Sequence, residues 1–239
     1  MKKRTVALLL AMMLAIGCGI GGTLAWLLDS DGEVKNTFTI SDVDIDLTEN
    51  DSTDDTDTDE QNNTYKMIPG HEISKNPTVT VNANSEPCYV FVEVEETGGN
   101  VTVTEGGSQD TKSFEDFIVY AMEDGWIQGE ADETTEGGVE GVPVNVYYRE
   151  IKSVTTAATS FAVIGNKGLD GEGAWEPNVV LVKPTVTKDM MQAVKDHNQE
   201  PKLNFYAYAS QLYKTNEQEF DVGEAWDLVK DLRPAYVTP

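Results

Sequence analysis

The stretch CYVFVEV, residues 88–94, decides the fold class because its apolar side chains recur with a period of two. In an extended chain, successive side chains point to opposite faces. One face of this stretch is small and apolar: Cys88, Val90, Val92 and Val94. The other face is mixed: Tyr89, Phe91 and Glu93. This pattern predicts a half-buried antiparallel strand.

Three other segments alternate in the same way: residues 79–83, 142–148 and 203–209. Short apolar runs add further strand candidates: residues 117–122, 160–164 and 178–182. Glycine-rich turns such as Thr97-Gly98-Gly99-Asn100 separate the strands. The sequence therefore predicts an all-β chain folded as an antiparallel β-sandwich.

Two short helices are predicted beside the strands. Thr187 can cap a helix that runs from Lys188 to about His197, and the apolar residues at helical spacing are Met190, Met191 and Val194. The sequence Asp221-Val222-Gly223-Glu224 is a capping box, and it precedes four apolar residues: Ala225, Trp226, Leu228 and Val229. Pro234 ends this second helical segment. We expect these helices to cover sheet edges or the ends of the sandwich.

The N-terminus has the layout of an export signal. Lys2, Lys3 and Arg4 precede residues 5–28, which carry no charge. Thr23 and Ala25 are small residues at the −3 and −1 positions of a cleavage site that leaves Trp26 first. The sequence predicts a signal peptide at 1–25 and a single β-sandwich domain at 26–239, although that length also fits two small domains. A retained membrane anchor and lipidation at Cys18 are the alternatives.

The charge of the chain limits its partners. Acidic residues number 42 against 17 basic ones, for a formal net charge of −25. Such a surface repels nucleic acid and anionic lipid, so we expect no nucleic-acid partner and membrane contact only before signal cleavage. Cys88 is the only cysteine outside the signal, so stability must come from a core rather than a disulfide.

Residues 42–60 are the most acidic segment. They hold ten acidic residues and no basic one. Val43, Ile45 and Leu47 alternate with aspartates and predict a strand, whereas residues 49–63 lose the apolar residues and predict a disordered acidic loop. Residues 129–141 and 168–173 are two further low-complexity loops. An EF-hand starting at Asp55 would need glycine and glutamate where Glu60 and Lys66 stand, which leaves at most weak, diffuse Ca²⁺ binding.

The chain offers no motif for catalysis. His71-Glu72 lacks the second histidine of a zinc-binding helix, because position 75 is lysine, and the turn at Pro69-Gly70 favours a surface histidine. Cys88 lies in a valine-rich strand, which favours a core residue over a nucleophile. The four tryptophans are expected in packing roles. We therefore predict no catalytic, cofactor-binding or metal-ligating residue.

The N-terminal region resembles the TasA/camelysin family, exported proteins of Gram-positive bacteria that are processed by a SipW-type signal peptidase. The similar residues are Gly21 to Trp26, Asp29, Asn36 to Ile40 and Val43 to Leu47. Weaker similarity continues in the turn at Pro69-Gly70, in residues 77–83 and 88–94, in residues 207–211 and in Glu224-Ala225-Trp226. Together these segments cover roughly half of the chain.

The resemblance implies a jelly-roll-like sandwich and a structural role in the extracellular matrix or on the cell surface, where the TasA branch forms biofilm fibres. It implies self-association or association with other matrix proteins. After cleavage, a strand-competent tail with Phe38, Ile40, Val43, Ile45 and Leu47 can add to a neighbouring subunit. Alternatively, Val43 to Leu47 pair within their own sandwich and leave Trp26 to about Phe38 as the donor. A secreted camelysin-like metalloendopeptidase and a monomeric surface binding or adhesion module are the competing functions.

Overall fold

The computed structural model describes residues 43–49, 64–130, 141–153, 156–165, 178–215 and 218–232. By its internal contacts the chain divides into two units, Met1–Ile40 and Ser41–Pro239, and all the described residues belong to the second unit. Several predictions therefore fall outside the described residues: the signal peptide, the cleavage residues Thr23, Ala25 and Trp26, the donor residues Phe38 and Ile40, and the loop segments 50–63, 131–140 and 168–173.

A four-stranded antiparallel sheet is built around the stretch that decides the fold. Its order is β12 (Lys202–Gln211), β4 (Cys88–Thr97), β9 (Val146–Ile151) and β8 (Ile127–Gln128). The register places Phe91 of β4 between Tyr208 of β12 and Tyr148 of β9. The alternating residues 88–94 thus form most of a central strand with a neighbour on each side.

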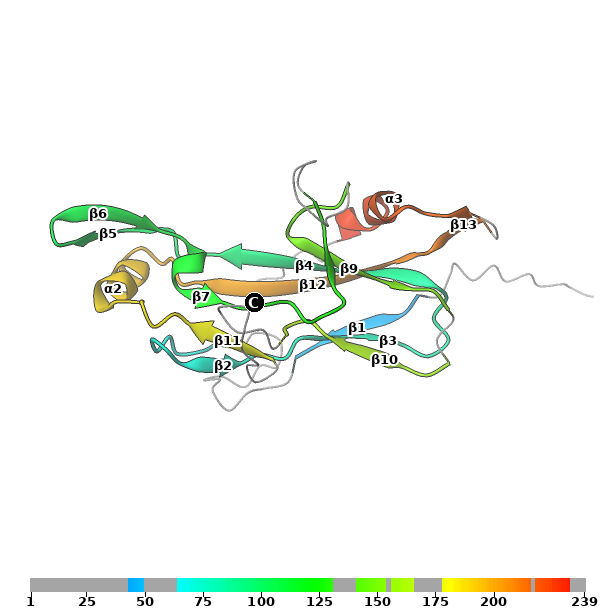
Figure 1. Ribbon diagram of the computed structural model, residues 1–239, viewed down its shortest axis with the longest axis horizontal. Helices are drawn as coiled ribbons and strands as arrows, with labels where there is room; N and C mark the ends of the chain where they lie inside the picture. Colours follow the sequence, from blue (N-terminus) through cyan, green and yellow to red (C-terminus); the bar gives the residue numbers. More distant parts are fainter. Residues whose placement is uncertain are drawn as a thin grey trace, which may run out of the picture. The chain divides into compact units, whose positions relative to one another are not determined.

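A three-stranded antiparallel sheet packs against one face of β4 (Figure 1). Its order is β1 (Ile45–Thr48), β3 (Thr78–Val81) and β10 (Thr159–Ala162). The buried residues between the two sheets form what we call the valine core: Val79, Val81, Cys88, Val90, Val92, Val94, Trp126 and Val163. Small side chains on both inner faces allow the sheets to approach closely, as in other sandwiches.

A second three-stranded sheet shares a hydrophobic core with a hairpin and a helix. Its order is β2 (Glu72–Ser74), β11 (Val179–Val182) and β7 (Ile118–Val119). The hairpin β5 (Val101–Glu105) and β6 (Ser108–Lys112) lies beside helix α2 (Lys188–Asp196), as Figure 1 shows. Between β6 and β7 the chain makes a short 3-10 helix, η1 (Phe114–Asp116). Val101 and Val103 of the hairpin share a core with Met190 and Val194 of the helix.

Helix α3 (Val222–Asp227) covers the other face of β4, and this corrects the prediction of a half-buried strand. Tyr89 and Phe91 are 7% and 0% exposed. The Phe91 ring lies 5.3 Å from the ring of Trp226, which in turn meets Tyr208 edge-on at 5.4 Å. Because large aromatic side chains occupy this face, the chain covers it with the helix. Strands β13 (Tyr213–Thr215) and β14 (Gln218–Glu219) lead into α3, and η2 (Lys230–Leu232) comes after it.

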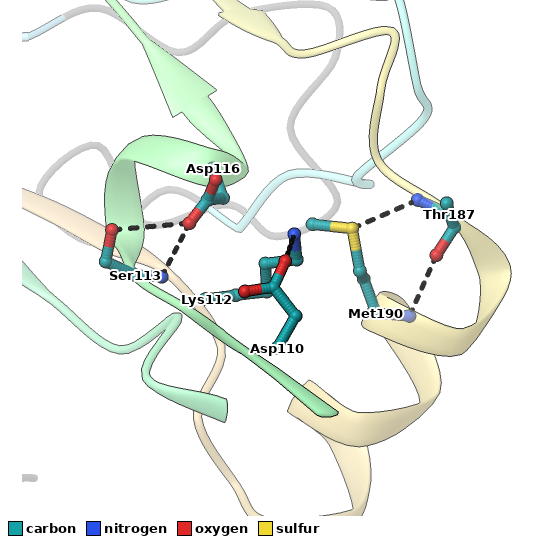
Figure 2. A network of polar contacts seen from close by, with 6 residues as sticks. All are labelled: Asp110, Lys112, Ser113, Asp116, Thr187 and Met190. Carbon is teal, nitrogen blue, oxygen red and sulfur yellow. Dashed lines mark hydrogen bonds and ion pairs between the residues drawn. The ribbon is translucent and has the colours of Figure 1, made fainter. Parts of the chain in front are cut away.

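Both predicted helices are confirmed with their caps. Thr187 accepts a hydrogen bond from the backbone N–H of Met190 at 3.2 Å, and Figure 2 shows this contact. The Asp221 side chain accepts from the N–H of Glu224 at 3.1 Å, and the Glu224 side chain accepts from the N–H of Asp221 at 3.1 Å. Figure 2 also shows Asp116 accepting from Ser113 at the start of η1. These local contacts set the first residue of each helix.

Three local predictions are wrong, and the apolar residue Leu228 lies largely exposed. The strand predicted over 79–83 ends at Val81, and the strand predicted over 142–148 begins only at Val146. Val144 is 44% exposed, because Pro143 and a turn interrupt the alternation. Leu228 is 54% exposed, because α3 ends at Asp227 and the next residue turns outward. Glu49, placed by its sequence in a disordered loop, forms the ion pair described below.

The predicted fold class is confirmed as an all-β antiparallel sandwich with two short peripheral α-helices. Every strand pairing in the described residues is antiparallel. Neighbouring strands are often far apart in the chain, as β12 and β4 are, which is typical of a jelly-roll-like arrangement.

Replacing Asp221 by alanine should lower the free energy of unfolding by about 1 kcal/mol, because the capping side chain of α3 is lost. The control is Asp227→Ala, which removes a surface ion pair with Lys230 whose partners are 64% and 45% exposed. Its loss should stay below about 0.5 kcal/mol. Urea denaturation of both variants measures the difference. Equal losses would show that the cap does not hold α3 on β4.

Candidate assembly edge

Strand β12 is a long edge strand without the features that usually protect such edges. Within the described residues it has one strand neighbour, β4, and the ladder runs without a break from Lys202 opposite Thr97 to Gln211 opposite Cys88. Residues 203–211 contain no charged residue and no proline. Natural edge strands are usually short, charged, bulged or interrupted by proline, because exposed backbone groups invite pairing with another chain. The bare edge of β12 is therefore the candidate functional site.

The register identifies the backbone groups that face outward from β12. The N–H of Val94 donates to the carbonyl of Asn145 at 2.8 Å, so Val94 points its backbone groups toward β9. Backbone direction alternates along a strand, so Glu93 and Phe91 point toward β12 and bond their partners Tyr206 and Tyr208. The outward N–H and C=O groups therefore belong to the intervening residues: Leu203, Phe205, Ala207 and Ala209.

The valine core is incompletely covered beneath this edge. Leu203, Phe205 and Ala207 of β12 pack against the core but are only partly buried, whereas Val90 and Val92 of the central strand are 0% exposed. Residues of the opposite sheet at the same core, Val43 and Ile45, are also partly buried. Strands β1 and β12 are in contact, so these apolar side chains belong to one side of the sandwich.

Polar side chains fix β12 to β4 on the face away from the valine core. The Tyr208 hydroxyl donates to Glu93 at 2.8 Å, and the Tyr206 hydroxyl donates to Glu95 at 3.0 Å. The Asn204 amide donates to the same Glu95 carboxylate at 3.2 Å. Hydrogen bonds to charged groups are stronger than neutral ones. The edge is thus a firmly held strand rather than a loose one.

An ion pair ties the end of β1 to this side of the sandwich. Lys75 contacts Glu49 at 2.9 Å, and the two side chains are only 12% and 16% exposed. The Tyr65 hydroxyl donates to the same carboxylate at 3.4 Å, and the Lys75 ammonium lies 5.6 Å from the centre of the Phe205 ring on β12. Glu49 and Tyr65, which flank residues 50–63 in the sequence, therefore lie beside each other in the sandwich.

The opposite side of the sandwich is bridged by side chains. The indole N–H of Trp126 donates to the carbonyl of Ala162 at 2.8 Å and so occupies an outward group of β10. The Arg149 guanidinium lies 4.9 Å from the Trp126 ring and 5.0 Å from the Phe161 ring, and it donates to the carbonyl of Asp124. Its burial lowers the pKa of Arg149, and Glu123 opposes this shift. Beyond the bridge, a groove of about 290 Å³ is lined by Val81, Ile151, Thr159 and Phe161 among others.

The remaining edges are short or acidic. Strand β8 has two residues, so it offers almost no backbone for pairing. Directly before β1, the backbone carbonyl of Asp44 accepts from the backbone N–H of Asn82 at 2.9 Å, so the backbone groups of Asp44 face β3. The backbone groups of Ile45 and Leu47 then face outward from the sheet, and the Leu47 residue is 37% exposed. Aspartates flank Ile45 on both sides and precede Leu47, which makes β1 a poorer template than β12.

Three of the predicted donor residues are placed by the structure. Val43, Ile45 and Leu47 lie in or beside β1, where Ile45 is opposite Val81 and Leu47 opposite Val79 of their own chain. This placement corresponds to the alternative in which these residues pair within their own sandwich. The other donor residues, Phe38 and Ile40, lie outside the described residues. The edge of β12 was not predicted, and the signal that could have found it is the uncharged run at 203–211.

The residues considered for catalysis lie apart. His71 comes after the turn at Pro69-Gly70 and directly precedes β2, as the sequence predicts, and it is half-buried. Cys88 is 0% exposed in the valine core, and burial raises its pKa from 9.0 to about 11. Among the described residues, no three His, Cys, Asp or Glu side chains are grouped so that they could hold a metal ion. Nor is any described helix long and apolar enough to cross a bilayer.

Comparison with known proteins adds one remote structural likeness. No family model matches the sequence, and no curated protein matches it. Among solved structures, the chain is similar to the crystal structure of HdaB, the minor tip subunit of the E. coli Hda pilus. The sequence identity is 12% and the TM-score is 0.25, over 75% of this chain and 87% of that chain. A likeness of this size carries no argument, so the resemblance to the TasA/camelysin family stays a prediction.

Replacing Lys75 by methionine should lower the free energy of unfolding by about 2 kcal/mol, because the Glu49 carboxylate stays mostly buried without its cation. Adding Glu49→Gln should recover at least half of that loss. The control is Lys152→Met, which breaks an ion pair whose lysine is 71% exposed and should cost less than about 0.5 kcal/mol. Urea denaturation of the wild type, Lys75→Met, Glu49→Gln and the double variant gives the coupling, and the control is measured beside them. Independent effects of the two substitutions would contradict the ion pair.

The Cys88 thiol should make the fold sensitive to alkali. The pKa of the thiol is ordinarily 9.0, and burial raises it to about 11. The buried neutral thiol therefore contributes fully to the free energy of unfolding below pH 9, and this contribution is lost as the pH rises toward 11. Over that window the loss is up to about 1.4 kcal/mol per pH unit. In protein that begins at Trp26, the fall in stability between pH 8 and 10.5 should be smaller for Cys88→Ala than for the wild type. Burial also raises the pKa of Tyr89 to about 12, and this contribution is common to both proteins. Parallel curves would contradict the buried thiol.

Proposed function

We propose that the protein is an exported, non-catalytic structural subunit of the cell surface or extracellular matrix, which assembles by donating its N-terminal segment to a neighbouring subunit. The signal-like sequence at 1–25 supports export. The similarity of residues 21–47 to the TasA/camelysin family supports a matrix role and processing by a SipW-type signal peptidase. In this role the protein would associate with other copies of itself or with other matrix proteins.

The single observation that carries the proposal is the edge of β12. It is a ten-residue strand in unbroken register, paired on one side within the described residues, and uncharged from Leu203 to Gln211. A long uncharged edge strand of this kind is a template for pairing with another strand. In a subunit that assembles by strand addition, an edge of this kind is a requirement.

The position of β1 supports donation of the segment before it. Ile45 pairs with β3, Val43 and Ile45 pack against the valine core, and β1 contacts β12, so β1 lies on the side of the sandwich that carries β12. A donor and an acceptor on one subunit make a head-to-tail contact, and such a contact propagates as a filament unless its rotation closes a ring.

Purified protein that begins at Trp26 should form fibres visible by negative-stain electron microscopy, and protein that lacks Trp26 to Ile40 should stay monomeric. The sandwich should be retained in both, because the deleted segment precedes β1, and circular dichroism checks this. A matched control replaces residues 26–40 by a glycine-serine segment of equal length, which keeps the chain length and removes the strand-forming side chains.

Equal fibre formation by the deleted form would contradict donation of the N-terminal segment. Persistent monomers of the intact mature form at high concentration would instead favour a monomeric surface module. Casein cleavage by zinc-loaded protein that is lost in His71→Ala would contradict the non-catalytic part of the proposal and favour the camelysin-like peptidase.

A further inference from the structure

We propose that the groove between the end of β9 and the start of β10 binds one N-acetylated sugar unit, an N-acetylhexosamine. Such binding goes beyond the proposed structural role and does not depend on strand donation. The groove has a volume of about 290 Å³. Binding sites for drug-sized molecules begin at about 300 Å³, so a groove of this size suits a single sugar ring.

The groove lies where the chain passes from one sheet of the sandwich to the other. Ile151 is the last residue of β9, in the four-stranded sheet, and Thr159 is the first residue of β10, in the three-stranded sheet. Ile151 lies opposite Cys88, and Thr159 lies opposite Val81. Residues directly opposite each other share a face of the sheet, so Ile151 and Thr159 point to the same side as the valine core. The groove therefore opens between the inner faces of the two sheets.

The buried part of the groove is apolar and held in place. It is formed by Val81, Ile151 and Phe161, which are buried or partly buried. The Arg149 guanidinium lies 5.0 Å from the centre of the Phe161 ring and donates to the carbonyl of Asp124. Because the ring is positioned before a ligand arrives, less conformational entropy is lost on binding.

The rim of the groove carries hydroxyl groups. Ser153, Thr156 and Thr159 line it and are exposed. The Thr159 hydroxyl donates to the carbonyl of Ala157 at 3.4 Å, and its oxygen can still accept a hydrogen bond from a ligand. A ligand that fits both parts has an apolar group at one end and hydroxyls at the other. An N-acetylhexosamine has this chemistry, with its acetamide methyl group for the floor and its ring hydroxyls for the rim.

Charge argues for a neutral ligand. All the residues that line the groove are uncharged, and residues 151–169 contain no acidic residue in a chain that has 42. Lys152, beside the rim, already pairs with Glu150 at 3.1 Å. An anionic ligand would be repelled by the net charge of −25, and a cationic ligand would meet no carboxylate on the groove lining.

The test titrates N-acetylglucosamine into protein that begins at Trp26. Saturation-transfer difference NMR observes the ligand, so it detects weak binding whether or not the protein assembles. We expect a dissociation constant on the order of 1 mM, as suits a small ligand in a shallow site. The acetamide methyl group should receive the strongest saturation. Glucose, which lacks the acetamide, should bind at least about fourfold more weakly, because less apolar surface is buried.

Substitutions at the groove locate the binding. Ala157→Phe places a ring in the groove from an exposed position and should abolish binding. Thr159→Val removes a rim hydroxyl at nearly constant volume and should weaken binding about fivefold. The matched control is Thr102→Val, the same change at an exposed position of β5, which should bind as the wild type does. Thermal unfolding confirms that each variant is folded. If Ala157→Phe does not fold, Thr159→Val and its control decide.

Each outcome bears on the groove alone. No saturation of the sugar by the wild type, or undiminished saturation with Ala157→Phe and Thr159→Val, would overturn the assignment. Equal binding of glucose and N-acetylglucosamine would overturn the role given to the apolar floor. Binding of the N-acetylglucosamine tetramer as well as the monomer would support recognition of a chain end, and binding of the monomer alone would support a free sugar. Fibre formation, measured in the same preparations, tests the proposed function separately.

Discussion

Burial of both faces of β4 is the constraint on which the rest of the structure depends. Its valines face β3 and its aromatic residues face α3, so one strand belongs to two cores. The small face allows a second sheet to pack closely, whereas the face with Tyr89 and Phe91 needs a cover of its own. Trp226 supplies this cover from the far end of the chain, and Tyr208 supplies it from the neighbouring strand. Because the central strand is enclosed in this way and paired on both sides, only the edge strands of its sheet remain available for pairing with another strand.

The edges of the sandwich are treated unequally. Strand β8 is short, and β10 is bridged by Trp126 and Arg149, whereas β12 is long, uncharged from Leu203 to Gln211 and firmly held by hydrogen bonds to Glu93 and Glu95. The ion pair of Lys75 with Glu49 fastens the end of β1 near β12, because the Lys75 ammonium also lies 5.6 Å from the centre of the Phe205 ring. Ion pairs that are largely buried contribute little net stability and are better at fixing positions. In this sandwich the pair fixes Glu49, at the end of β1, beside Lys75 and Tyr65.

Local signals in the sequence predicted local structure well. Thr187 and Asp221 marked the first turn of each helix because a cap depends on residues within four positions of one another. Period-two alternation predicted the strands because it, too, depends only on residues that are close together in the sequence. Burial of Tyr89 and Phe91 was not predictable, because it depends on Trp226, which is far away in the chain. The interruption of the strand predicted at 142–148 was indicated in the sequence by Pro143, because proline seldom occupies a strand interior.

The candidate edge was harder to find than the fold because a sequence shows that a segment is a strand but not which strands are its neighbours. Alternation in residues 203–209 predicts the same half-buried strand whether it lies at the centre or at the edge. The distinguishing property is the absence of charge from this segment, in a chain of net charge −25. At physiological salt, charges are screened beyond about 8 Å, whereas paired strands lie about 4.8 Å apart. The charge at the contact itself therefore decides whether two acidic copies can pair. Within this sandwich, the uncharged residues 203–211 are better suited to pairing than the aspartate-rich segment around β1.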